Sequence, residues 1–124
     1  MYNKEVEDIS QVINDYFMGL YNGDIDRLKQ AFYPTAILWG DINGSEYMKS
    51  LDEFTTAVSN RKSPADNNEP FNMSITGIEV LGNNAMTKLH VPILGNNYHE
   101  FISLSKVSGR WWIVNKLFTN ISHG

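Results

Sequence analysis

The chain has 124 residues and a mass of 14.1 kDa, the size of one domain, and we expect a single domain over residues 1–124. With 42% hydrophobic and 19% charged residues it is too apolar for a disordered chain, and no apolar run approaches the roughly 18 residues that cross a bilayer. A net charge of -4 with scattered basic residues argues against nucleic acid as a partner, and the absence of cysteine excludes disulfides, thiolate catalysis and cysteine-ligated metals.

The N-terminal segment is predicted to form two helices. Its first ten residues mix charged and apolar side chains without the apolar stretch of a signal peptide, which favours a cytoplasmic location. Apolar residues recur at intervals of three and four from Lys4 to Asn22, which predicts an amphipathic helix. Gly23 suits a left-handed C-cap and Asp24 suits the N-cap of a second helix, which we expect to continue through Phe32 until Pro34 stops it.

A hairpin and a third helix follow. Residues 35–40 form a strand candidate, and the Asn-Gly pair at 43–44 is typical of a tight hairpin turn that returns through residues 45–48. Ser50 and Glu53 have the spacing of a capping box, in which each side chain satisfies a free backbone amide at the start of a helix. We therefore expect a third helix directly after the hairpin.

The rest of the chain is predicted to be an antiparallel meander. Short turn sequences separate four runs rich in β-branched and aromatic residues, namely 71–81, 84–94, 98–107 and 110–119. Gly77 inside the first run predicts a bulge, because glycine weakens a regular strand and permits a bend. The chain is therefore expected to have an α+β fold, helices first and a curved sheet after them.

Register arithmetic from the two hairpin turns divides the meander into two faces. The face expected to meet the helices carries Leu89, Val91, Ile93, Tyr98, Glu100, Ile102, Leu104, Trp111, Ile113, Asn115 and Leu117. The opposite face carries His90, His99, Phe101, Ser103, Ser105, Trp112, Val114, Lys116 and Phe118. Glu100 and Asn115 stand out on the first face, because a carboxylate or amide among aliphatic side chains needs polar partners. They therefore indicate a site.

Two stretches of the sequence carry a family resemblance. Tyr16-Phe-Met-Gly-Leu-Tyr-Asn-Gly-Asp24 resembles the first helix and following turn of the nuclear transport factor 2-like superfamily, which includes SnoaL-like cyclases and ketosteroid isomerase. The segment from Phe101 to Phe118 resembles its final hairpin, and the ending Lys-Val-Ser-Gly-Arg-Trp with Ile-Val-Asn-Lys-Leu-Phe is most similar to the "putative lumazine-binding" family. The resemblance implies a cone of three N-terminal helices on a strongly curved antiparallel sheet. It says little about function, because this scaffold hosts enzymes, binding proteins and assembly modules.

The resemblance transfers only part of a catalytic site. Tyr16 matches the oxyanion-stabilising tyrosine of ketosteroid isomerase, and Glu100 lies near the position of its protonated acid. The position of the general base falls at Gly40, and Asp41 is expected to point to the other side of the strand. Without that base the catalytic site of the isomerase does not transfer to this sequence, and no cofactor motif is recognised.

The predicted site is a pocket between the first helix and the concave sheet. We expect Tyr16, Trp39, Glu100 and Asn115 to line it, with Tyr98 and Phe54 near its mouth. Glu100, as an acid, would donate a hydrogen bond to a ligand carbonyl alongside Tyr16. Two alternatives stay open: Tyr16 is a core tyrosine, and Glu100 pairs with Lys116.

The other face of the sheet is expected to form an interface. His90 and His99 are predicted to be diagonal neighbours there without a third ligand, so no metal site is expected. Its aromatic and aliphatic members are too apolar for a fully wet surface, which predicts a homodimer through Phe101, Trp112, Val114 and Phe118.

Three functions are compatible with these observations. The favoured one is the binding of a small aromatic or cyclic ligand in the cone, because the site has hydrogen-bonding groups and aromatic walls without a recognisable base. The alternatives are a cyclase, isomerase or dehydratase that uses Tyr16 and Glu100, and a non-catalytic dimeric assembly module with a fully packed cone.

Overall fold

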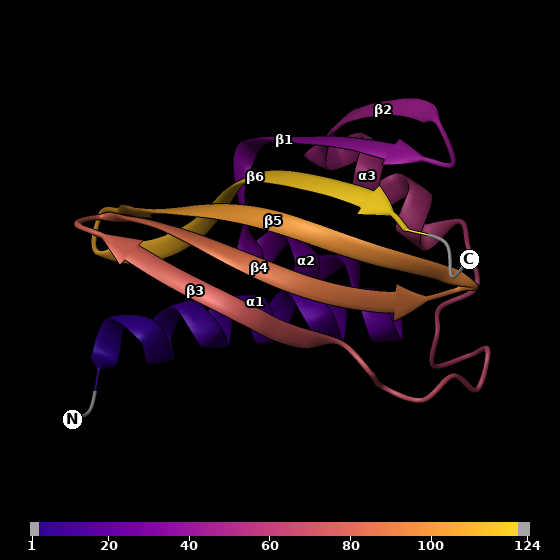
Figure 1. The fold of residues 1–124 in the computed structure, drawn as a ribbon, viewed down its shortest axis with the longest axis horizontal. Coiled ribbons are helices and arrows are strands. Elements are labelled where there is room, and N and C mark those ends of the chain that lie inside the picture. The colour runs from indigo at the N-terminus through magenta and orange to yellow at the C-terminus, as the bar shows by residue number, and fades with distance from the viewer. Residues whose placement is uncertain (1–2, 122–124) are drawn as a thin grey trace.

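A computed structural model describes residues 3–121 (Figure 1). The helices are α1 (Lys4–Asn22), α2 (Ile25–Ala31) and α3 (Leu51–Ser59). The strands are β1 (Phe32–Ile42), β2 (Ser45–Ser50), β3 (Ser74–Leu81), β4 (Asn84–Ile93), β5 (Asn96–Val107) and β6 (Arg110–Asn120). Among the described residues, no helix is long and apolar enough to cross a membrane.

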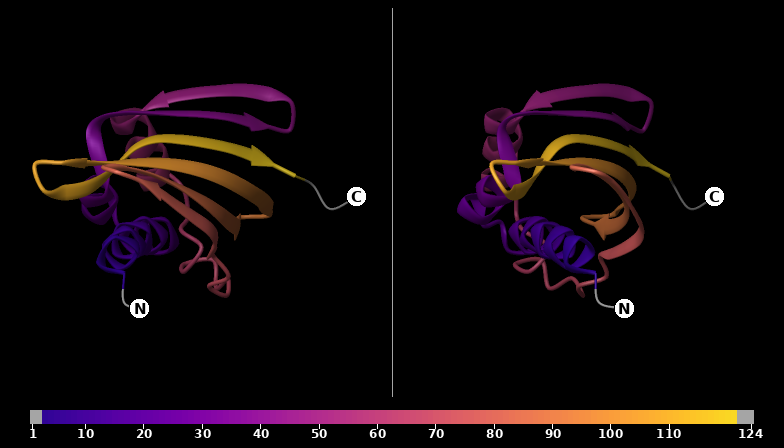
Figure 2. Two further views of the ribbon diagram at one scale, coloured as in Figure 1. Left: turned by 60° about the vertical axis from the view of Figure 1, so that its left-hand side comes forward. Right: turned by 90° about the vertical axis from the view of Figure 1, so that its left-hand side faces the viewer.

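The strands form one curved sheet in the order β2-β1-β6-β5-β4-β3. All neighbouring strands are antiparallel except β1 and β6, the first and last strands in the sequence, which pair in parallel. Figure 2 shows the sheet curling over α1, so that the helices fill its concave side. The predicted α+β cone is confirmed, with one parallel pair in an otherwise antiparallel sheet.

The helix boundaries follow the capping residues, with one correction. Gly23 ends α1 in the left-handed conformation at φ 66°, and the Asp24 side chain accepts from the backbone N–H of Arg27 at the start of α2. The prediction that α2 continues through Phe32 is wrong, since α2 ends at Ala31 and Phe32 already begins β1. The residue before a proline is driven toward extended backbone, so Pro34 ends the helix earlier than its own position.

The predicted hairpin and third helix are confirmed. Asn43 and Gly44 form the turn between β1 and β2, both with positive φ (53° and 88°). Ser50 and Glu53 form the expected capping box: the Glu53 N–H donates to Ser50 Oγ (3.2 Å) and the Ser50 N–H donates to Glu53 Oε1 (3.0 Å). This cap fixes where α3 starts under the sheet.

The β4–β5 register differs from the predicted one by two residues. Leu94 and Gly95 make the turn, so His90 lies directly opposite His99, whereas the predicted register made the two histidines diagonal neighbours. A shift of two residues leaves every side chain on its predicted face, because side chains alternate with a period of two. The predicted bulge at Gly77 is also confirmed by a register shift between β3 and β4.

An unpredicted bulge in β6 exchanges the two faces to which the side chains at the end of this strand point. Leu104 pairs with Ile113 as expected, but Ser103 pairs with Asn115, so Val114 is an extra residue. Beyond it the predicted faces of four residues are wrong. Lys116 and Phe118 point to the concave side, and Asn115 and Leu117 point outward.

The core lies between the helices and the part of the sheet before this bulge. The residues predicted to face the helices there are buried, namely Leu89, Val91, Ile102, Leu104, Trp111 and Ile113. Two independent hairpin registers predicted this face, and the structure confirms it. The first half of β6 therefore packs against the helices through Trp111 and Ile113. Beyond the bulge, the second half of the strand places the polar side chain of Lys116 on the concave side of the sheet.

Candidate functional site

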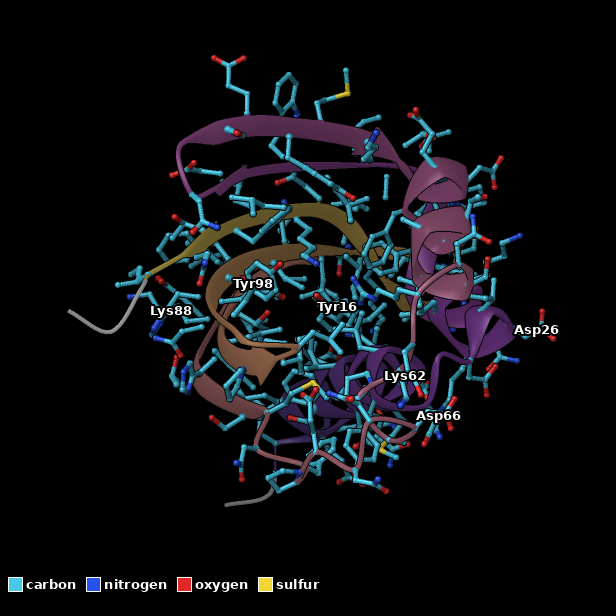
Figure 3. The ribbon with its side chains drawn as sticks, turned by 90° about the vertical axis from the view of Figure 1, so that its right-hand side faces the viewer. Tyr16, Asp26, Lys62, Asp66, Lys88 and Tyr98 are labelled. Carbon is cyan, nitrogen blue, oxygen red and sulfur yellow. The ribbon has the colours of Figure 1, made fainter. Side chains whose placement is uncertain are left out.

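A buried polar triad lies on the concave side of the sheet. The Tyr16 hydroxyl donates to Glu100 Oε1 at 2.6 Å, and Lys116 Nζ lies 3.5 Å from Glu100 Oε2. Tyr16 comes from α1, Glu100 from β5 and Lys116 from β6, so three elements distant in sequence meet here. Figure 3 shows Tyr16 and Tyr98 on the inside of the curved sheet, whereas Lys88 points away from it.

The surroundings of the triad are aromatic and almost dry. Glu100 is 4% exposed and Lys116 is 5% exposed. Lys116 Nζ lies 4.7 Å from the ring centre of Phe54 and 4.8 Å from that of Phe118, distances at which a cation is attracted to an aromatic face. Burial lowers the pKa of Lys116, and the Glu100 carboxylate opposes that change. The Glu100–Lys116 pair is therefore maintained because a buried charge without its partner would destabilise the fold.

Tyr16 is the deepest member of the triad. Its side chain is fully buried, and its hydroxyl proton is committed to Glu100. Burial, followed by the nearby Glu100 charge, raises the pKa of Tyr16 well above its ordinary value. Tyr16 therefore acts as a donor that orients Glu100, which differs from the expected joint donation of Tyr16 and Glu100 to a ligand.

A small cavity of about 50 Å³ opens beside the triad. Its polar lining consists of Tyr47, Arg61, Tyr98, Glu100 and Lys116. Its apolar lining consists of Leu20, Ile42, Phe54, Ile93 and Phe118. Sites that enclose a drug-sized molecule measure roughly 300–1,000 Å³, so this cavity admits a group of a few heavy atoms and the remainder of a ligand would lie at its mouth.

Arg61 adds a cation to the cavity from the segment that follows α3. Its Nε atom is buried and has no hydrogen-bond partner among the described residues. Its positive charge acts on the hydroxyls of Tyr47 and Tyr98, where it opposes the rise in pKa that burial causes. The guanidinium group therefore sits close to both tyrosines, and the described part of the chain supplies no carboxylate that pairs with it.

The structure brings together four of the six predicted site residues. Tyr16 and Glu100 form the buried hydrogen bond, while Phe54 and Tyr98 line the cavity with Glu100. The alternative in which Glu100 pairs with Lys116 is confirmed. The site is therefore centred on Tyr16 and Glu100, as predicted, and Lys116 is an additional member.

Trp39 and Asn115 lie outside the cluster, which corrects the predicted pocket. Trp39 is 51% exposed because Leu38, its neighbour in β1, occupies the inward position. Asn115 is turned outward by the β6 bulge, and its side-chain amide donates to the Ile37 carbonyl at 3.1 Å. Both residues belong to the outer side of the sheet.

The position that would carry the base of a ketosteroid isomerase is closed in this protein. A Cβ atom on Gly40 would lie 2.4 Å from the ring of Phe118, so the glycine is required for the close approach of that ring. Asp41 is engaged elsewhere, since its carboxylate accepts from the Gly44 N–H at 2.8 Å in the hairpin turn. Phe118 therefore fills the space beside β1.

Sequence reasoning missed four of the polar and aromatic residues that line the cavity: Tyr47, Arg61, Lys116 and Phe118. Lys116 and Phe118 were assigned to the outer face because nothing in the sequence marks the β6 bulge. Tyr47 was within the predicted hairpin, where its inward direction follows from the register, with Gly40 opposite it. Arg61 lies in an irregular segment, where no periodicity reports direction.

The histidine pair lies away from this cavity. The rings of His90 and His99 stack at 4.8 Å between centres, and His90 Nε2 is 2.6 Å from Asn97 Oδ1. They are direct cross-strand partners rather than the predicted diagonal neighbours. Within residues 3–121 no cluster of three or more potential metal ligands is present.

Comparisons with known proteins agree with this fold. A family described as "Putative lumazine-binding" matches residues 4–119. The chain resembles nuclear transport factor 2-like (NTF2-like) proteins of unknown function from Shewanella baltica (TM-score 0.86, 22% identity, 99% of this chain and 98% of that one) and Silicibacter pomeroyi (0.82, 20%, 95% and 97%). A third, from Methylobacillus flagellatus, has a TM-score of 0.81 and 20% identity, with 98% of this chain and 96% of that one covered.

No curated protein matches the chain. The structural similarities are all at low sequence identity, so they establish the NTF2-like fold. The family match covers nearly the full chain, and it is therefore the family match that identifies the protein: it belongs to the "Putative lumazine-binding" family.

Proposed function

We propose that this protein binds a small aromatic or cyclic molecule at the mouth of the cone. The observation that carries the proposal is the polar cavity beside Glu100 and Lys116, which combines buried charges with aromatic walls. A protein that only needed stability would replace such a buried pair by apolar side chains at little or no cost. The family description, which mentions lumazine binding, supports the same class of function.

The two alternatives are less well supported by the geometry. An enzyme of the cyclase or isomerase kind would present Tyr16 to its substrate, but Tyr16 is fully buried behind Glu100 and does not line the cavity. A pure assembly module would have a solid cone, whereas a charged cavity remains here. Binding accounts for both observations, and the cytoplasm remains the expected location.

The test is native mass spectrometry of the protein purified from the cells that naturally produce it. We expect a retained small molecule that leaves on denaturation. Its occupancy should fall in the double variant Tyr47→Phe/Tyr98→Phe, because both tyrosines line the cavity and the variant removes their hydroxyl donors. Tyr33→Phe is the matched control, since the Tyr33 ring packs on Trp112 away from the cavity. Equal occupancy in all three proteins would contradict the proposed location, and no retained mass in any preparation would count against ligand binding.

We also propose that the outer face of the sheet forms a homodimer. Its exposed side chains include Ile37, Trp39, Met48, Met86, Phe101 and Leu117, with exposed fractions of 36 to 52%. Phe118 leaves the predicted patch because the β6 bulge turns it inward, and Leu117 takes its place. A shallow depression of about 480 Å³ on this face, lined in part by Phe101 and Leu117, adds apolar surface for a second copy.

Light scattering coupled to size-exclusion chromatography tests this interface. We expect a dimer mass at micromolar concentration and at least a tenfold weaker association for Phe101→Glu, because the ring is 50% exposed at the centre of the face. Phe71→Glu is the control, since Phe71 packs on Tyr21 of α1 instead. A monomer mass for the unmodified protein would exclude the dimer.

A further inference from the structure

The cavity carries one positive charge that has no salt-bridge partner within residues 3–121. Lys116 and Glu100 form an ion pair, which is neutral as a unit. Arg61 remains, with its buried Nε atom lacking a hydrogen-bond partner in the described part of the chain. A buried donor without a partner destabilises the protein unless a ligand completes it. An anion bound beside Arg61 would supply both a negative charge for the guanidinium group and a hydrogen-bond acceptor for its Nε–H.

The other polar groups of the cavity are also donors. Tyr47 and Tyr98 line it, and within residues 3–121 neither hydroxyl makes a hydrogen bond to the protein. Burial raises the pKa of both tyrosines, so at neutral pH each hydroxyl keeps its proton. The Lys116 ammonium group adds a further donor, because Glu100 occupies only one side of it. Donors from four side chains therefore surround a space that holds a few atoms.

Size and charge select the class of anion. A volume of about 50 Å³ fits a carboxylate group, whose planar oxygens match the donor geometry of a guanidinium. The single uncompensated charge matches a monoanion, whereas a phosphate dianion would leave the cavity negative. The rings of Tyr47 and Tyr98 stand edge-on to Phe118, with centres 5.1 and 5.6 Å apart, and form an aromatic rim for a flat ring outside the cavity.

We propose that the cavity recognises the carboxylate of an aromatic or cyclic acid, with Arg61 as its main partner and Lys116, Tyr47 and Tyr98 as further donors. This inference rests on the proposed ligand-binding function of the same cavity. It adds the chemical class of the ligand, which neither the family description nor the fold provides.

The test is an NMR titration of the full chain with benzoate, with its neutral analogue benzamide and with inorganic phosphate. We expect benzoate to shift the amide signals around Arg61, Tyr47 and Tyr98, and benzamide to bind at least tenfold more weakly. Arg61→Gln should weaken benzoate binding at least tenfold, and Arg61→Lys should retain part of the affinity. Lys62→Gln is the matched control, since it removes an adjacent but exposed charge and should change the affinity less than twofold.

The outcomes separate the two proposals. Equal binding of benzoate and benzamide at the cavity, unaffected by Arg61→Gln in a folded variant, would overturn the carboxylate assignment and leave ligand binding intact. Tighter binding of phosphate than of benzoate would overturn the assignment to carboxylates. Shifts confined to the outer face, or none with any of the three probes, would overturn the assignment and count against the cavity as a binding site.

Discussion

Replacing Lys116 by Met should lower the free energy of unfolding by about 3–5 kcal/mol, the cost of breaking a buried ion pair from one side. Lys116 and Glu100 are both nearly fully buried, and their charged atoms lie 3.5 Å apart. Without the ammonium group, the hydrogen bond from Tyr16 is the one side-chain partner that residues 3–121 leave to Glu100. The carboxylate then has to be protonated or hydrated inside an aromatic shell, and either change costs stability. Urea unfolding measures the loss.

The double variant Lys116→Met/Glu100→Gln is the informative comparison. Because it removes both charges, its stability should return to within about 2 kcal/mol of the unmodified protein. Lys106→Met is the surface control, since its partner Glu5 lies at 3.2 Å with both side chains partly exposed, and it should cost less than about 1 kcal/mol. If the double variant is no more stable than Lys116→Met alone, the loss of stability does not come from the unpaired charge of Glu100, and this explanation is wrong.

Trp111→Ala should cost about 3–5 kcal/mol, the range for removing a large aromatic side chain from a core. Trp111 is 2% exposed, and its Nε1–H donates to Glu5 Oε2 at 2.6 Å. The substitution leaves a void under β6 and removes one of two links from the sheet to Glu5 in the first turn of α1, the other being the ion pair with Lys106. Thermal or urea unfolding at low protein concentration gives the change without a contribution from dimerisation.

Trp39→Ala is the control for this substitution, because Trp39 is 51% exposed on the outer face. Most surface substitutions change stability by no more than about 0.5 kcal/mol, so we expect a far smaller effect. A loss at Trp39 as large as that at Trp111 would show that the two faces of the sheet have been assigned the wrong way round.

Local signals in the sequence predicted most of the fold. The caps at Gly23, Asp24 and Ser50 involve short-range hydrogen bonds and backbone conformations that the residue types themselves favour. The Asn-Gly turn at 43–44 predicted the first hairpin, and the turn at 108–109 predicted the pairing of β5 with β6 as far as the bulge. These features need no information from distant parts of the chain, which is why they were predictable.

The end of β6 was not predictable from its pattern. Asn115 with Leu117 and Lys116 with Phe118 each combine one polar and one apolar residue, so hydrophobicity does not favour either pair for the inner face. No glycine marks the extra residue at Val114. What favours the observed choice is a tertiary partner, Glu100, which gives the inward lysine its ion pair.

Tyr16 and Glu100 of the candidate site were predictable from the sequence, whereas Arg61 was not. The family resemblance, together with the buried position of a carboxylate, identified Tyr16 and Glu100, and the hydrogen bond between them is present. Arg61 has no comparable signal, since it lies in an irregular segment whose direction depends on how the chain leaves α3. The charge of the cavity, on which the proposed class of ligand rests, therefore became visible only in three dimensions.

A crystal structure of the protein purified from its natural cells, with any retained molecule in place, tests the central claim most directly. We predict electron density at the mouth of the cone, with a carboxylate within hydrogen-bonding distance of Arg61 and a ring against Tyr47, Tyr98 and Phe118. A well-ordered cone in which protein side chains close the cavity, with ligand density only on the outer face of the sheet, would contradict the claim.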